Sequence, residues 1–283
     1  MTDKNIEYLA KSIRYDCLKM LYHCGYGHLG GSFSIIELLA VLYSKHIKYD
    51  PKNPNWDQRD YLVLSKGHAG PALYSTLANL GFFDKKVLMT LNQGGTKLPS
   101  HADRNLTTGI DVTTGSLGQG TSKAAGLAMG FKKLKKSNYV YLIVGDGELN
   151  EGQCWEAFQF IANYSLNNCV VIIDDNKRQL DGYTKDVINP FDIKKKMESF
   201  GFFTRKVKAN NIDEIDKELN ILKSHKSQAV CLILDSIKGQ GIKYFEELNE
   251  NHSVKFNNER IIKETELALA NLREELKGGS YHD

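Results

Sequence analysis

Short apolar segments that recur between amphipathic stretches are the feature that most constrains how this chain can fold. Residues 61–64, 139–144, 169–173 and 230–234 are apolar runs rich in Val and Ile, and residues 202–207 form a weaker run. Continuous runs of this length are typical of strands buried on both faces of a sheet. We therefore expect strands at these positions, with 202–207 at an edge of the sheet.

Amphipathic stretches of helical length lie between these runs, at residues 35–46, 71–80, 122–134, 155–164 and 212–222. Strands that alternate with helices predict an α/β fold with a doubly wound, mostly parallel sheet. The sequence has no internal repeat and no linker rich in Pro or Ser, so residues 1–283 are interpreted as one domain. Residues 257–277 are predicted to form a charged peripheral helix, followed by a loose tail.

Composition excludes several classes of protein. Lys and Arg exceed Asp and Glu by 37 − 34 = 3, which is too small an excess to favour nucleic acid as a partner. No run approaches the roughly 20 apolar residues that a membrane helix needs, and the first residues lack the apolar core of a signal peptide. The five cysteines are scattered without a CxxC pair, which favours reduced thiols and a cytoplasmic protein.

The segment Gly145-Asp146-Gly147 directly follows the predicted strand at 139–144. Ligands of open α/β sheets bind beyond the carboxyl ends of strands, so a site is expected at this point. Glycines let the backbone approach a phosphate, and the following helix N-terminus favours anions. Asp146 adds a carboxylate suited to a divalent cation. Alone, however, a glycine-flanked Asp is also typical of an ordinary turn between a strand and a helix.

A second polar segment, Asp174-Asp175-Asn176, follows the next strand along the chain. Parallel neighbours end side by side, so Asp146 and Asn176 can face one ion. At this spacing the two segments resemble the thiamine-diphosphate-binding motif. The resemblance implies Mg²⁺, or Ca²⁺ or Mn²⁺, held by Asp146, Asn176 and the backbone carbonyl of Arg178. It also implies cofactor contacts from Gly147, Glu148 and Asn176.

Further segments, all in the same order along the chain, narrow the resemblance to the transketolase family. Residues 27–32 (GHLGGS) resemble the segment whose His, here His28, contacts substrate beside the thiazolium. Residues 65–74 (SKGHAGPALY) resemble the segment whose His, here His68, bonds the diphosphate. Residues 99–103 (PSHAD) resemble the segment whose His, here His101, bonds the first hydroxyl of the donor sugar.

Two more segments extend the resemblance to most of the chain. Residues 114–120 (TGSLGQG) resemble the loop that runs along the cofactor, which implies contacts from Gly115, Ser116 and Leu117. Residues 238–241 (KGQG) with His252 resemble the family's ending, in which that His lies near both diphosphate and substrate. The resemblance therefore implies His28, His101 and His252 as catalytic residues, and His68 and His252 as cofactor-binding residues.

Alternatives remain at the level of single residues. A lone loop His is more often a structural hydrogen-bonding group than a catalyst, and His23, His46, His225 and His282 belong to no motif. The loop at residues 115–120 has the pattern GxxGxG, which disfavours a nicotinamide enzyme. The sequence also departs from the family, with Ser116 in place of Pro and Ser253 in place of Gly, so His252 has the weakest context.

The resemblance covers only half of a full-length transketolase. In that family the glutamate that activates the cofactor, and most groups that bind the sugar phosphate, lie on a second α/β domain. The chain is therefore expected to be either a natural subunit or a fragment, and its Met1 and charged terminal helix favour the subunit. Its partner would be a separate C-terminal subunit in an α2β2 heterotetramer. Glu151 and Glu156 match family glutamates that lie toward the dimer interface.

The resemblance implies transfer of a two-carbon ketol unit from a ketose phosphate to an aldose phosphate. One alternative is an unusual donor, such as a sulfonated or branched sugar. Another is a non-catalytic thiamine-diphosphate-binding subunit, which is disfavoured because Asp146, Asn176, His28 and His101 are all present. A third is the α chain of a 2-oxo-acid dehydrogenase, which should lack the segments at 65–74 and 99–103.

Overall fold

The apolar runs of the sequence form one five-stranded sheet. The computed structural model describes residues 3–277, so the predicted tail and His282 lie outside the described residues. Strands lie side by side in the order β2-β3-β4-β8-β7, and every neighbouring pair is parallel. Their bounds are Tyr61–Leu64 (β2), Val140–Gly145 (β3), Cys169–Asp175 (β4), Phe202–Lys208 (β7) and Ala229–Asp235 (β8). The α/β prediction is confirmed, including the edge position of β7.

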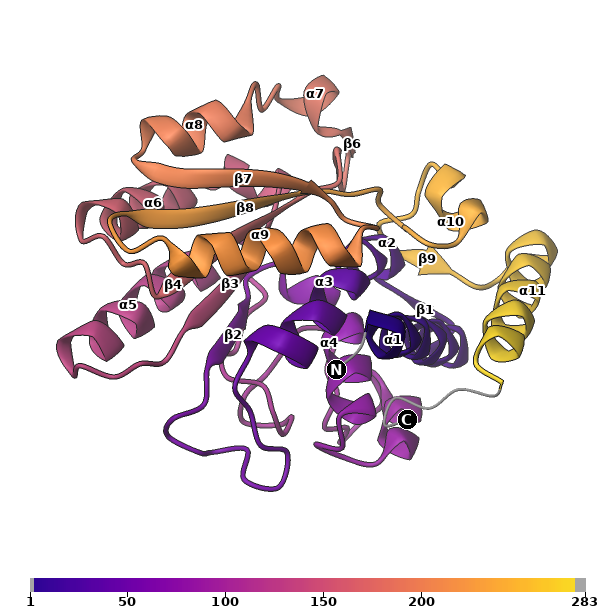
Figure 1. Ribbon diagram of the computed structural model, residues 1–283. Coiled ribbons are helices and arrows are strands. Elements are labelled where there is room, and N and C mark those ends of the chain that lie inside the picture. Colours follow the sequence, from indigo (N-terminus) through magenta and orange to yellow (C-terminus); the bar gives the residue numbers. More distant parts are fainter. Residues whose placement is uncertain (1–2, 278–283) are drawn as a thin grey trace.

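Helices cover both faces of this sheet (Figure 1). On one side lie α1 (Asp3–Cys24), α3 (Ile36–Val41), α4 (Gly70–Asn79) and α9 (Ile212–Ser224). On the other lie α5 (Gln119–Lys133), α6 (Gly152–Asn163) and α8 (Ile193–Ser199). The short helices are α2 (Leu29–Phe33), α7 (Thr184–Val187), α10 (Lys243–Glu247), a π-helical turn η1 (Leu42–His46), and the 3₁₀ turns η2 (Gly67–Ala69), η3 (Lys85–Thr90) and η4 (Gly147–Asn150).

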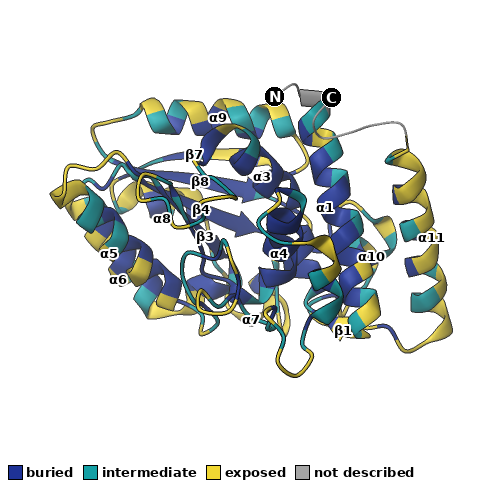
Figure 2. Cartoon of the chain, turned by 90° about the horizontal axis from the view of Figure 1, so that it is seen from below, coloured by how far each residue is buried: buried dark blue, intermediate teal, exposed yellow. Residues whose placement is uncertain are grey.

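Alternate residues of the central strands enter two separate cores. In β3, Tyr141 and Ile143 face the core beneath α1, α3, α4 and α9, whereas Leu142 and Val144 face the core beneath α5, α6 and α8. Every residue of β3 and β4 is buried, as Figure 2 shows for the middle of the molecule. This burial explains why the strands appear in the sequence as continuous apolar runs rather than alternating ones.

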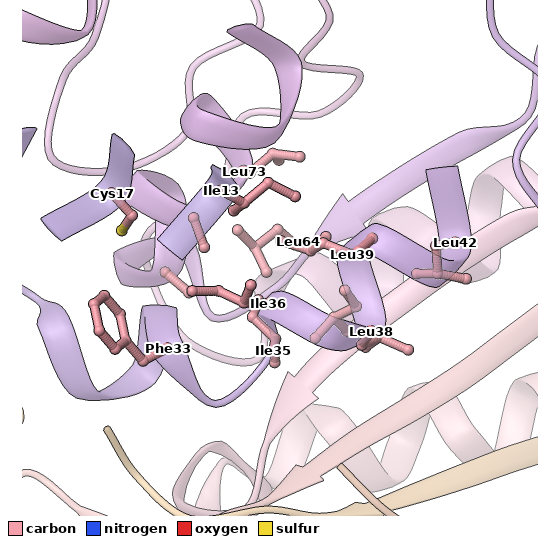
Figure 3. Packing of buried hydrophobic residues seen from close by; sticks show 14 of the residues in the cluster. Ile13, Cys17, Phe33, Ile35, Ile36, Leu38, Leu39, Leu42, Leu64 and Leu73 are labelled. Atoms are coloured by element: carbon pink, nitrogen blue, oxygen red, sulfur yellow. The ribbon is translucent and has the colours of Figure 1, made fainter. Parts of the chain in front are cut away.

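The larger core is built where three helices meet the sheet. Ile13 and Cys17 of α1, Leu38 and Leu39 of α3, and Leu73 of α4 are all buried, and Figure 3 shows these side chains converging. Burying a Leu or Ile side chain is worth roughly 1.5–3 kcal/mol relative to exposing it. This packing holds the helices whose connecting loops carry the polar motifs.

Two small antiparallel pairs lie outside the main sheet. β1 (Tyr26–Gly27) pairs with β9 (Val254–Lys255), and β5 (Arg178–Gln179) pairs with β6 (Gly182–Tyr183). The last helix, α11 (Glu259–Glu275), packs against α1 at the edge of the molecule (Figure 1). An ion pair of 2.9 Å between Lys11 and Glu275 joins the two helices.

The sequence pattern did not predict α1. Its buried residues recur at helical spacing, but charged residues interrupt them throughout the helix. Within residues 3–277, no helix is both long and apolar enough to cross a membrane. All five cysteines are free thiols, and burial raises the pKa of Cys154 and Cys169 to about 12.

Candidate active site

The polar motifs meet at the carboxyl ends of β3 and β4. A cavity of about 380 Å³ opens there, lined in part by Asp146, Asn176 and four histidines. The two strand ends are held together directly, because the backbone N–H of Asp146 donates to the carbonyl of Asp174 at 3.1 Å. The cavity therefore lies where an open parallel sheet is expected to bind its ligands.

The predicted metal ligands present oxygen atoms from these two strand ends. Asp146 accepts the N–H of Gly147 at 2.9 Å through Oδ1 and the N–H of Lys177 at 2.7 Å through Oδ2. Asn176 accepts the N–H of Arg178 at 3.1 Å through Oδ1. Each of these oxygens has a second lone pair that these contacts leave open. Burial, reinforced by Asp174 and Asp175, raises the pKa of Asp146 to about 7.

A lysine ammonium already contacts one of the predicted ligands. The Nζ atom of Lys238 lies 3.3 Å from the carbonyl of Arg178, 3.2 Å from that of Gln179 and 3.1 Å from Nδ1 of His252. Lys238 is almost fully buried, and burial lowers its pKa to about 8. The backbone here thus aims carbonyl oxygens at a cation, which is what the predicted metal site requires.

No group of three or more His, Cys, Asp or Glu side chains in the described part of the chain is arranged to hold a metal ion. The predicted set contains only one carboxylate, with one amide and one carbonyl beside it. Six-coordinate Mg²⁺ bound by so few protein groups takes its other ligands from phosphate and water. The donor set therefore fits a metal that binds together with a diphosphate, rather than a metal held by protein side chains alone.

The structure brings the four motif histidines into one cluster. The ring of His28 is 5.6 Å from His68, 5.6 Å from His101 and 5.3 Å from His252, measured between ring centroids. The rings of His68 and His252 are 5.0 Å apart. These residues come from four separate segments of the sequence. His23, His46 and His225 do not line this cavity.

Backbone contacts between distant segments explain the clustering. The β1–β9 pair places Gly27 opposite Val254, and the N–H of Gly30 donates to the carbonyl of Asn251 at 2.9 Å. A Cβ atom at position 30 would lie 2.4 Å from that carbonyl oxygen, so only glycine allows the approach. His28 and His252 therefore meet because two short segments pair across the whole length of the chain.

Burial and proximity keep the cluster uncharged near neutral pH. Burial, reinforced by the neighbouring ammonium of Lys238, lowers the pKa of His252 to about 3. Burial also lowers the pKa of His28, His68 and His101. Neutral imidazoles can each donate one hydrogen bond and accept another. The cluster can thus bond hydroxyl groups in either direction.

The remaining predicted cofactor contacts differ in their position. Gly115, Leu117, Gly147 and Glu148 line the cavity, whereas Ser116 is exposed and is not part of its wall. The carboxylate of Glu148 is buried and accepts three hydrogen bonds: from Ser65 Oγ at 2.5 Å, from the N–H of Gly118 at 2.8 Å and from the N–H of Gly145 at 3.1 Å. Glu148 thus joins the end of β3 to the segment after β2 and to the start of α5.

Sequence reasoning missed a buried polar network that adjoins the cavity and reaches its wall at Lys66. Lys66 and Asp174, which are 1% and 0% exposed, form an ion pair of 2.6 Å. Burial alone would raise the pKa of Asp174, but Lys66 and hydrogen bonds from two serines lower it. Lys66 lies inside the quoted SKGH segment and Asp174 precedes the Asp175-Asn176 pair, so both positions were visible in the sequence, although their contact was not.

Comparison with known proteins identifies the family. Residues 6–270 match the family described as transketolase, thiamine diphosphate binding domain. The chain belongs to the transketolase family. It is 43% identical over 256 residues to the 6-deoxy-6-sulfo-D-fructose transketolase subunit of a Clostridium species, a match that covers 90% of this chain and 93% of the relative. It is 36% identical over 250 residues to an apulose-4-phosphate transketolase subunit of Actinobacillus succinogenes, covering 88% of each chain.

Solved transketolase structures share the fold. The transketolase of Campylobacter jejuni superposes with a TM-score of 0.87 at 30% identity, covering 95% of this chain but only 43% of that one. The human transketolase is 35% identical over 255 residues, which are 38% of its length. This chain thus corresponds to less than half of a full-length transketolase, and to nearly all of the separate subunits of two-chain transketolases.

Proposed function

We propose that this transketolase subunit binds thiamine diphosphate and Mg²⁺ in the cavity at the ends of β3 and β4, and that it transfers a ketol unit together with a separate partner chain. The convergence of His28, His68, His101 and His252 on the cavity beside Asp146 and Asn176 carries the proposal. When bound, the cofactor would supply a nucleophilic carbon for addition to the carbonyl of a ketose and would take up the electron pair of the C2–C3 bond as that bond breaks.

The metal end of the cavity is assigned to Asp146, Asn176 and the carbonyl of Arg178. The oxygens of Asp146 and Asn176 come from adjoining strand ends, and the ammonium of Lys238 lies 3.3 Å from the carbonyl of Arg178, so that carbonyl already faces a cationic group. Gly147 and His68 are assigned to the diphosphate. Gly147 begins the 3₁₀ turn η4 and lines the cavity, and glycine lets the backbone approach a phosphate closely.

The sugar end is assigned to His28 and His101, with His252 between the sugar and the diphosphate. His28 and His101 are both half-buried, so their rings are reachable from the cavity mouth. As neutral imidazoles they can orient the hydroxyls of a ketose and move a proton as charge develops on its oxygen. Lys238 lies close enough to His252 to fix the orientation of its ring.

The proposal of a partner chain rests on how much of each relative's length this chain covers. The chain matches 43% of the Campylobacter jejuni transketolase but 93% of a relative that is named as a subunit. We therefore propose a separate C-terminal subunit that supplies the activating glutamate and the groups that bind the far end of the sugar, in an α2β2 assembly. Glu151, which is exposed at the cavity, and Glu156, which is exposed on α6, are assigned to the side that faces this assembly.

The proposed donor is a ketose phosphate and the proposed acceptor an aldose phosphate. A sulfonated or branched ketose is the second candidate. It is favoured by the names of two relatives, which specify 6-deoxy-6-sulfo-D-fructose and apulose-4-phosphate. Both kinds of donor share a ketose head that His28 and His101 would bind in the same way.

The assignment of the sugar end is tested with His28→Ala and His101→Ala in the complex with the partner chain. Each change should lower turnover by about 10²–10⁴-fold, the range for one positioned proton donor or acceptor. Affinity for the cofactor should change little, because the diphosphate is assigned to other groups. His225→Ala, a change at a histidine outside the cavity, is the matched control.

Melting temperature, cofactor affinity and donor turnover are measured together on each variant. A structural role for these histidines predicts a loss of about 1–3 kcal/mol in stability with normal turnover of the folded enzyme. That result in both variants would overturn the assignment of the sugar end, even though the family membership would stand.

A further inference from the structure

We propose that the buried pair Lys66–Asp174 is a positioning unit that fixes which end of the Asn176 amide faces the cofactor cavity. The inference rests on the proposed function, in which Asn176 binds the metal through Oδ1. It adds two residues that act through Asn176: Asp174, which does not line the cavity, and Lys66, which lies at its wall.

Asp174 is the centre of a closed set of hydrogen bonds. Its Oδ2 accepts Lys66 Nζ at 2.6 Å, Ser34 Oγ at 2.7 Å and Asn176 Nδ2 at 2.8 Å. Its Oδ1 accepts Ser236 Oγ. All five of these side chains are buried, and Asp174 itself does not line the cavity. The donors come from four different segments of the chain.

The chemistry of the carboxylate determines the orientation of the amide. An ionised carboxylate only accepts hydrogen bonds, so the group of Asn176 that faces Asp174 must be its NH₂. The carbonyl end then points the other way, where Oδ1 accepts the N–H of Arg178 at 3.1 Å. Asn176 is thus held at both ends, with its remaining oxygen lone pair open to a cation. Without Asp174, its NH₂ loses its buried acceptor.

Lys66 allows the carboxylate of Asp174 to stay ionised although Asp174 is fully buried. An isolated carboxylate in the protein interior is strongly unfavourable, and a paired one requires good geometry and full hydrogen bonding. The ammonium of Lys66 supplies the opposite charge and also donates to the carbonyl of Gly31 at 2.7 Å. Gly31 follows His28 by three residues and lies against the ring of His68. Lys66 therefore links the metal end of the cavity to the histidine cluster.

The competing explanation is that the pair only holds loops together. The two explanations differ in what an apolar replacement does. Exchanging a buried ion pair for apolar residues of similar size is often tolerated for stability. Such an exchange leaves Asn176 without its acceptor, however. Changes of groups that orient a metal ligand typically cost about 10–100-fold in metal affinity.

The first test compares two double variants in the complex with the partner chain. Lys66→Met/Asp174→Leu removes the pair beneath Asn176. Arg59→Met/Asp111→Leu removes a control pair of 3.0 Å, which is also largely buried but lies outside this cavity. Calorimetry measures the affinity for thiamine diphosphate with Mg²⁺, at a temperature at which every variant is folded. We expect a loss of about 10–100-fold in the first variant and none in the control.

A conservative variant separates orientation from charge. In Asp174→Asn, the amide oxygen can keep accepting from Lys66, Ser34 and Asn176, while its NH₂ turns to Ser236, whose hydroxyl can accept. Asn176 stays oriented, so Asp174→Asn should bind the cofactor nearly as wild type does. A loss as large as that of the apolar double variant would overturn the orienting role of Asp174.

Asp146→Ala distinguishes failure of this inference from failure of the proposed function. If Asp146→Ala removes the Mg²⁺-dependent affinity but Lys66→Met/Asp174→Leu does not, the positioning role is refuted and the metal site stands. If Asp146→Ala also leaves the affinity unchanged, the metal site itself is refuted. Loss in both, with retention in Asp174→Asn and in the control, is the result that the inference predicts.

Discussion

Glu148 offers a quantitative test of how the cavity is held together. Its carboxylate is 2% exposed and accepts Ser65 Oγ and the N–H of Gly118 at one oxygen, and the N–H of Gly145 at the other. In Glu148→Gln, one of these oxygens becomes an NH₂ group that cannot accept. The Ser65 hydroxyl can reorient, but a backbone N–H cannot, so either orientation of the amide leaves one backbone N–H unpaired.

Leaving a buried donor unpaired costs about 1–3 kcal/mol. Each kcal/mol lowers the melting temperature by about 2–4 °C for a domain somewhat smaller than this one, so a decrease of several degrees is expected. Affinity for thiamine diphosphate should fall as well, because the three segments that Glu148 joins all line or adjoin the cavity.

Calorimetric melting of Glu148→Gln measures the effect, with Glu198→Gln as the matched control. Glu198 lies on α8 with its side chain 47% exposed, and surface changes of this kind usually alter stability by less than about 0.5 kcal/mol. If Glu148→Gln and Glu198→Gln melt at the same temperature, the three hydrogen bonds do not support the cavity and the reasoning is wrong.

Two further predictions concern the metal and the pH dependence of stability. Asp146→Ala or Asn176→Ala should abolish Mg²⁺-dependent cofactor binding while the fold remains intact. Calorimetry on the complex with the partner chain measures this affinity. Unchanged affinity in both variants would contradict the assignment of these residues as metal ligands. Burial lowers the pKa of His46 to about 4, below its unfolded value of about 6.5. The unfolded chain therefore takes up this proton first, and about 3 kcal/mol of stability present above pH 6.5 is lost as the pH falls to 4. Urea unfolding of wild type and His46→Gln at pH 7 and pH 4.5 tests this; an equal acid loss in both proteins would contradict it.

The strands of the sheet could be predicted from the sequence because they are buried on both faces. Continuous runs such as residues 61–64 and 169–173 correspond closely to β2 and β4. Helix α1 was missed because Ser12, Arg14 and Asp16 are buried among its apolar residues. A helix that is buried on most sides and includes polar residues on those sides gives a weak periodic signal.

Site residues that belong to a sequence motif could be predicted, whereas contacts between distant segments of the chain could not. Asp146 and Asn176 could be placed together because neighbouring parallel strands end at one edge. The two-residue pairing of β1 with β9, which brings His28 to His252, is too short to leave a pattern in the sequence. The hydrogen bonds of Glu148 to Ser65 and Gly118 likewise join residues that are 30 or more positions apart along the chain.

The buried pair Lys66–Asp174 was hidden for the same reason. Each residue stands in a polar motif, where a charged side chain is usually interpreted as exposed or as a ligand. Only the contacts that the segments following α2 and β2 make with Asp174 show that the two charges neutralise each other. Contacts between segments 108 residues apart follow from the order of the strands and not from local composition.

The central claim is that this chain is one half of a ketol-transferring enzyme. The most direct measurement is transfer from a ketose phosphate, and from a sulfonated ketose, to an aldose phosphate, by the purified chain alone and after mixing with its partner chain. With thiamine diphosphate and Mg²⁺ present, we expect no transfer by the chain alone and restored transfer in the mixture. Sustained turnover by the isolated chain would contradict the claim.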